Sequence, residues 1–267
     1  MSARASVRAI PTMIRIGFAE ALAYRAEMLV WILATTMPLV MLALWHAVAR
    51  EAPVGRFGES QFVAYFLAMF IVRQLTGSWS VWLINMEVRD GTLALRMLRP
   101  VHPLLSYAMS SLAELPVRGL LAVPAAIVAL GVLAHDQLTS DPVTWALWAV
   151  SILGGWLLTL FANFAIGCLA LFIESSTKVM DVWLALYFVF SGYMVPVELF
   201  PARLRAAIDW MPFRYQLGLP VELMTGAHDH AAAIALLGRQ WLLVLVMALV
   251  VAIIWKRGAR RFAAYGG

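Results

Sequence analysis

The polar residues of this sequence are few, and their spacing does not predict an enzyme. The five histidines are scattered, and His228-Asp229-His230 lacks the i, i+4 carboxylate setting of a zinc-protease helix. No Gly-x-x-x-x-Gly-Lys-Ser/Thr occurs, so no P-loop is present to hold nucleotide phosphates. A membrane-embedded hydrolase or transferase is therefore disfavoured. We expect no catalytic residue, metal site or cofactor in this chain.

Residues 87 to 103 form a charged run between two apolar segments, and their types predict a short helix with both ends marked. Gly91 lets the chain turn sharply, Asp90 or Thr92 can cap the start, and Pro100 ends the helix. Apolar contacts would come from Leu93, Leu95 and Leu98. A helix of about two turns is not stable alone in water. It therefore needs a partner surface or the membrane face, and an ordinary interfacial loop helix is the alternative.

Arg73 and Gln74 fall near the middle of an expected membrane span, where a charge is costly and marks a functional candidate. Arg73 would face a wet cavity or an anionic part of a substrate. Alternatively it snorkels, or bonds carbonyls and Asn163 across a helix interface. Glu114 and Arg118 are spaced to pair along one helix face, and we interpret that pair as structural.

Composition places the chain in a bilayer. Hydrophobic residues make up 63% and charged residues 13%, and the mean hydropathy is +0.84. Hydropathy along the chain predicts an all-α membrane protein with six transmembrane helices in a single transmembrane domain over residues 1–267. The expected spans are Met28–Val48, Phe62–Ile84, Leu115–Leu133, Trp145–Ile173, Val182–Pro196 and Ala232–Trp255.

The basic residues predict the orientation, because cytoplasmic loops are enriched in Lys and Arg. In a six-span layout, both terminal segments, the 87–103 loop and the loop at Lys178 share one side and carry most of the basic residues. We therefore expect both termini in the cytoplasm. The net charge of +5 reflects this asymmetry, and we expect no nucleic acid partner.

Two further segments have their own patterns. Residues 1–26 place apolar and basic residues on opposite faces, which predicts an interfacial elbow helix. Residues 197–230 are largely apolar and interrupted by prolines, which predicts short re-entrant external helices buried in protein. Within them, Trp210 and Phe213 would be gate or membrane-belt aromatics.

The pattern Glu87-x-Arg89-x-Gly91-x-Leu93, followed by Leu98-Arg99-Pro100 and Pro103, resembles the first cytoplasmic loop of bacterial type-2 ABC exporter permeases. Further similar segments, in the same order, are Tyr24–Glu27, Arg73–Trp79, Ser191–Pro196 with Phe200-Pro201, and Leu219–Leu223 with Gly226. In that family the loop forms the coupling helix, which sits in a cleft of the ATPase subunit.

The resemblance implies two groups of site residues. The ATPase-coupling residues would be Glu87, Arg89, Gly91, Thr92, Leu93, Leu95, Leu98, Arg99 and Pro100. Together with the polar residues inside the expected spans, it leaves as candidate pathway or gate residues Arg73, Gln74, Asn163, Tyr193, Trp210 and Phe213.

The resemblance also implies partners. The chain would be the permease subunit of an ATP-driven exporter of an amphiphilic, lipid-like or drug-like substrate. Its partners would be separate ABC ATPase subunits that bind ATP and Mg, a second identical or homologous permease, and membrane lipids. The alternatives are an ATP-independent carrier or channel and a lipid-linked glycan exporter subunit.

Overall fold

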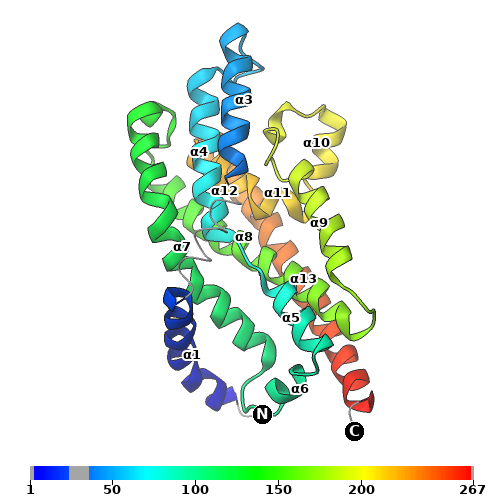
Figure 1. The fold of residues 1–267 in the computed structure, drawn as a ribbon. Coiled ribbons are helices and arrows are strands. Elements are labelled where there is room, and N and C mark those ends of the chain that lie inside the picture. The colour runs from blue at the N-terminus through cyan, green and yellow to red at the C-terminus, as the bar shows by residue number, and fades with distance from the viewer. Residues whose placement is uncertain (1–2, 24–35, 266–267) are drawn as a thin grey trace.

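The computed structural model describes residues 3–23 and 36–265, and their regular structure is helical apart from one isolated bridge between Val54 and Phe57. Figure 1 shows the helices running along one long axis, with the two ends of the chain near the same end of the molecule. The α-helices are α1 Ala3–Ala23, α3 Met37–Glu51, α4 Glu59–Thr76, α5 Ser80–Arg89, α6 Leu93–Met97, α7 Pro103–Leu133, α8 Pro142–Cys168, α9 Thr177–Phe190, α10 Ala202–Ile208, α11 Pro212–Gln216, α12 Gly218–Met224 and α13 His230–Tyr265. The 3-10 helices are η1 His135–Gln137, η2 Leu169–Leu171 and η3 Val197–Leu199.

Within the described residues, three segments are long and apolar enough to cross a membrane: Glu59–Arg89, Pro142–Leu171 and His230–Phe262. A bent pair, Pro103–Leu120 with Ala122–Leu133, makes a fourth if it counts as one span. These segments correspond to the expected second, fourth, sixth and third spans.

Fewer than six spans are found among the described residues. Residues 28–35 of the expected first span lie outside the described residues, and α3 has 15 residues. The expected fifth span ends early, because α9 has 14 residues and stops at Phe190. At 1.5 Å per residue such helices are about 21 Å long, against a hydrocarbon layer of about 30 Å.

The bend in α7 has a local cause. The two halves meet at 47° between Leu120 and Ala122. Pro124 follows within the same helix, and its missing N–H removes the bond that the carbonyl of Leu120 would accept.

Helix α8 is the centre of the molecule, where it contacts α4, α5, α9, α11, α12 and α13. Helix α13 packs along it, and the buried Gln240 amide donates bonds of 2.9 Å to the carbonyls of Ser151 and Tyr215. A Cβ on Gly154 would lie 2.7 Å from Gln240 Cδ. The absence of a side chain at Gly154 therefore lets the two helices meet.

Helix α1 lies within the expected segment 1–26 and packs on α7. A Cβ on Gly17 would lie 2.9 Å from Ala113 Cβ, so the closest approach is at Gly17. Phe18, the next residue, is 40% exposed. The small residue determines which face of α1 packs on α7, because only it allows the backbones to approach so closely.

The close contact of α8 and α13 predicts that Gly154→Val destabilises the protein. The added methyl groups collide with Gln240, and overpacking of this kind costs about 1–3 kcal/mol. We expect the Tm in detergent to fall by about 5 °C. Gly238→Ala is the control, because a Cβ there meets nothing within 4 Å; equal Tm values for both variants would contradict the prediction.

Candidate functional site

The long apolar segment formed by α4 and α5 is broken at Gly77, Ser78 and Trp79. A break inside a bilayer leaves backbone groups that must find partners within the protein. Asn163 of α8 supplies one, because its Oδ1 accepts a hydrogen bond of 3.2 Å from the amide of Val81. Its Nδ2 donates a bond of 2.9 Å to the carbonyl of Thr159. Asn163 therefore supports the backbone at the break.

Arg73 lies in the last turn of α4, beside this break. Its guanidinium stands 5.9 Å from the ring of Trp79 and 5.7 Å from the ring of Tyr187, and it also interacts with Tyr193. Among the described residues, no carboxylate forms an ion pair with Arg73 within 4.0 Å. The structure thus brings Arg73 and Tyr193 together.

A small cavity of about 20 Å³ lies at the break. Arg73 and Asn163 line it together with four residues that were not among the site residues expected from the sequence, namely Thr159, Trp82, Trp183 and Tyr187. The spacing of Trp183 and Tyr187, four residues apart in an expected span, is the signal that points to them. Gln74 is buried in α4 outside this lining, and Phe213 packs against Trp183 with ring centroids 4.7 Å apart.

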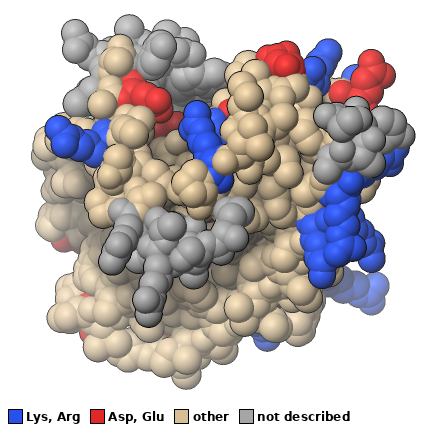
Figure 2. Space-filling model, turned by 90° about the horizontal axis from the view of Figure 1, so that it is seen from below, with Lys and Arg blue, Asp and Glu red and all other residues tan. Residues whose placement is uncertain are grey.

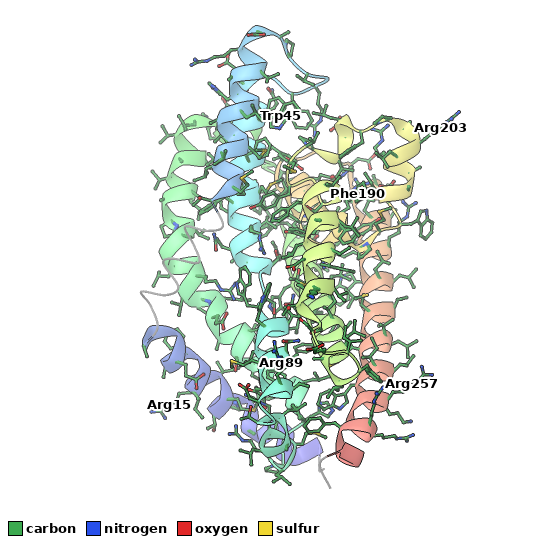
Figure 3. The ribbon with its side chains drawn as sticks, turned by 45° about the vertical axis from the view of Figure 1, so that its right-hand side comes forward. Arg15, Trp45, Arg89, Phe190, Arg203 and Arg257 are labelled. Atoms are coloured by element: carbon green, nitrogen blue, oxygen red, sulfur yellow. The ribbon has the colours of Figure 1, made fainter. Side chains whose placement is uncertain are left out.

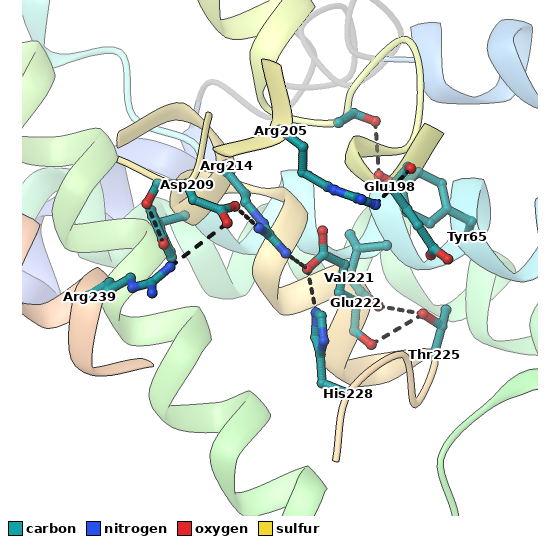
Figure 4. Close-up of polar contacts among 12 residues, drawn as sticks. Tyr65, Glu198, Arg205, Asp209, Arg214, Val221, Glu222, Thr225, His228 and Arg239 are labelled. Atoms are coloured by element: carbon teal, nitrogen blue, oxygen red, sulfur yellow. Dashed lines mark hydrogen bonds and ion pairs between the residues drawn. The ribbon is translucent and has the colours of Figure 1, made fainter. Parts of the chain in front are cut away.

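A second cluster, around Arg214, lies at the end of the molecule that carries α10 (Figures 1 and 4). The buried guanidinium of Arg214 pairs with Asp209 and donates a bond of 2.7 Å to Glu222. His228 Nε2 lies 2.7 Å from the same Glu222 oxygen. Burial would raise the pKa of the Glu222 carboxyl, but Arg214 and His228 outweigh it and hold that pKa at about 2.

The Arg214 cluster borders a cavity of about 450 Å³ that Arg205 and Arg239 also line. Trp210 is 66% exposed, and the Arg239 guanidinium lies 5.4 Å from the centre of its ring. It therefore belongs to this end of the molecule and not to the Arg73 cavity. The sequence did not predict the cluster, because its partners come from α10 to α12 and the loop before α13.

The run 87–103 folds into α6 and its flanks, and Glu87 is buried at the end of α5. Its carboxylate accepts two bonds from Arg96, one of them 2.8 Å long from Nε, and a third of 2.5 Å from the Tyr107 hydroxyl. The Arg96 guanidinium also stands 4.4 Å from the Tyr107 ring. Glu87 therefore ties α5, α6 and α7 together.

The short helix expected within residues 87–103 is observed as Leu93–Met97. Thr92 is its N-cap residue and Leu98 its C-cap residue. Gly91 has φ +74, the left-handed region that glycine adopts readily. The Thr92 hydroxyl lies 3.5 Å from the carbonyl of Glu87 and does not cap the helix. Capping by the Thr92 side chain, one of the two options expected, is therefore not observed.

Leu93 is fully buried against Cys168 and Leu171. By contrast, Leu95 is 65% exposed and Leu98 is 82% exposed. The exposed leucines lie beside Arg89, Arg99 and Pro100, which are exposed as well. We call Leu95, Leu98, Arg89, Arg99 and Pro100 the α6 surface.

The α6 surface lies at the end of the molecule that carries both chain ends (Figure 1). Seen from that end, Lys and Arg side chains gather in groups near the rim (Figure 2). Figure 3 shows Arg15 and Arg257 toward this end and Arg203 at the opposite one. Among the described residues, no group of three or more His, Cys, Asp or Glu is placed to hold a metal ion.

These features define an all-helical, multi-pass membrane protein. The chain belongs to the ABC-2 family transporter proteins, whose family model matches residues 54–266. It is therefore the membrane component of an ABC-2 type transporter, a kind of subunit that lacks an ATPase domain and implies an ATPase partner. A search of the curated proteins finds no match.

The buried contacts of Glu87 predict that Glu87→Ala loosens α6. Arg96 and Tyr107 lose their shared acceptor, and the loss of hydrogen bonds to a charged group costs about 1.5–3 kcal/mol. We expect amide hydrogen exchange of residues 93–98 to accelerate at least ~10-fold, equivalent to about 1.4 kcal/mol. The control is Arg89→Ala, since Arg89 is exposed; unchanged exchange in Glu87→Ala would show that the Glu87 contacts do not hold α6.

Proposed function

We propose that this chain is the permease subunit of an ATP-driven exporter, and that the α6 surface docks into a separate ATPase subunit. The observation that carries the proposal is the pair of exposed leucines on a helix fixed by buried bonds. Leu95 and Leu98 are exposed, while the buried Leu93 and the Glu87–Arg96 pair fix α6 to the membrane helices. The α6 surface is therefore a fixed apolar surface flanked by arginines, which suits binding in a cleft of a soluble partner.

The contacts of Glu87 also offer a route for motion. ATP binding would pull two ATPase subunits together and displace α6. The bonds of Glu87 to Arg96 and Tyr107 would then move the end of α5 and the start of α7 together. Helix α5 leads directly to the break at Gly77 and to the cavity lined by Arg73 and Asn163. The motor and the candidate pathway would thus be joined by one helix of 10 residues.

The finer topology belongs to the same proposal. We place both termini and α6 in the cytoplasm of a bacterial inner membrane, which the arginines and lysines near α1, α6 and the end of α13 support. In this arrangement α3 and α9 would complete six spans, α1 would be the elbow helix, and α10 to α12 would form the re-entrant external region. A second permease copy or homologue would complete the pathway. The substrate we propose is amphiphilic.

The proposed docking predicts that Leu95→Asp and Gly91→Val uncouple the transporter. Aspartate removes an apolar contact from the interface, and valine is strained at the positive φ of Gly91. Loss of one buried interface leucine costs about 2 kcal/mol, or roughly 30-fold in affinity. The permease, purified from its native membrane, should therefore retain much less ATPase subunit and ATPase activity.

The control for these variants is Leu204→Asp, a leucine that is 36% exposed on the short helix α10 at the opposite end of the molecule. It should keep its ATPase subunit. Intact assembly with full transport-linked ATPase activity in both α6 variants would refute the docking. A wild-type chain that purifies without any ATPase would favour the ATP-independent carrier or channel instead.

A further inference from the structure

The break between α4 and α5 brings two arginine side chains to one glycine. The point where a Cβ on Gly77 would lie is 2.8 Å from Arg118 Nη1 and 3.4 Å from Arg73 Nη1. Two guanidinium groups therefore lie against the same glycine inside the helical bundle. The absence of a side chain at Gly77 lets both approach the backbone there, because a Cβ would collide with Arg118 Nη1.

The charge at this place is unbalanced among the described residues. Arg118 is 5% exposed, and its partner is Glu114, at 2.5 Å. Arg73 has aromatic rings but no carboxylate partner among the described ion pairs. Moreover, the Nε atoms of Arg73 and Arg118 are both buried without a hydrogen-bond partner. Arg118 is buried and Arg73 is partly buried, and a cation in such a place is costly unless an anion neutralises it.

The geometry suits an anion that carries several acceptor oxygens. Guanidinium groups bind phosphate and carboxylate through two parallel N–H bonds, and the free Nε–H groups supply such donors. A phosphate that accepts from both arginines would use the unpartnered donors and balance the charge.

A route from the lipid side borders this place. A cavity of about 310 Å³ between α5 and α7 is lined by Glu114, Ser111, Trp82 and Met86. Its wall includes the carboxylate that pairs with Arg118, and Ser111 Oγ is buried there without a partner. Trp82 and Met86 are exposed on the lipid-facing surface of α5. The cavity thus has polar groups at Glu114 and Ser111 and apolar groups that suit an acyl chain.

We propose that Arg73 and Arg118, across Gly77, form a binding site for the anionic headgroup of the transported amphiphile. This assignment rests on the proposed transport function and adds the charge of its substrate class. The headgroup enters between α5 and α7 and displaces the Arg118 side chain from Glu114 in part. Arg73 and Arg118 are the residues that select for negative charge.

The test measures lipid binding to the purified full-length permease by native mass spectrometry. Phosphatidylglycerol is the anionic probe, phosphatidylcholine the zwitterionic one, and inorganic phosphate the free anion. We expect phosphatidylglycerol to bind at least ~10-fold more tightly than phosphatidylcholine. Gly77→Ala keeps both charges, but its Cβ would displace the Arg118 guanidinium and disturb the spacing of the two groups, so the preference should fall below about twofold.

Two further variants keep the test decisive. Arg73→Gln should lose the preference, which covers the case in which Gly77→Ala does not fold. Gly131→Ala should retain it, because a Cβ there meets nothing within 4 Å. An equal affinity for both lipids, or a preference unchanged in Gly77→Ala and Arg73→Gln, overturns the site. Inorganic phosphate binding as tightly as phosphatidylglycerol overturns the assignment to an amphiphile.

Whether the bound anionic lipid is the transported molecule is measured separately, by the ATPase activity of the purified complex in nanodiscs. Phosphatidylglycerol should stimulate the wild-type activity severalfold over phosphatidylcholine, and Arg73→Gln should abolish the difference. Selective binding without stimulation overturns the assignment to the transported molecule. A permease that binds phosphatidylglycerol but has no ATPase partner refutes the proposed function and leaves the binding result standing, so the two failures are distinguishable.

Discussion

The structure depends on one constraint: inside a bilayer, polar backbone groups and charges must find their partners within the protein. The break at Gly77 to Trp79 interrupts a segment that could otherwise cross the membrane as one straight helix. Asn163 bonds the freed amide of Val81, and aromatic rings cover Arg73. The break therefore concentrates polar groups at one depth, and this makes it the candidate pathway. The same constraint explains why an unpaired guanidinium edge there calls for an anion.

The end of α5 is subject to the same constraint, because a buried carboxylate there must also find its partners within the protein. Glu87 is buried, so Arg96 and Tyr107 must satisfy its carboxylate. Those bonds fix a short helix that would not be stable alone. Because α6 is fixed from within, it can expose Leu95 and Leu98 and still move as one body with α5 and α7. In the proposed docking, the residues that would contact the ATPase and the residues that would transmit its motion are therefore different, although they alternate along one run of sequence.

Hydropathy and turn residues predicted the helical class, the short helix after Gly91 and the pairing of Glu114 with Arg118, which is confirmed at 2.5 Å. They did not predict the break at Gly77, because one glycine in an apolar run is compatible with a continuous helix. Glu87 was expected among the docking residues, whereas its carboxylate is buried. Its partners, 9 and 20 residues away, meet it only after α7 packs beside α5. Tertiary packing, which local sequence patterns do not encode, also forms the Arg214 cluster.

The central claim is that a separate ATPase drives this permease through the α6 surface. Photo-crosslinking in the native membrane tests it most directly, with a photoreactive amino acid in place of Leu98 and, in a second variant, of Leu204 on α10. Leu98 is 82% exposed, so the probe should not disturb the packing of α6. The account predicts a crosslink from position 98 to an ATP-binding subunit and none from position 204. No crosslink from position 98 in an active complex, or an equal one from both positions, would contradict it.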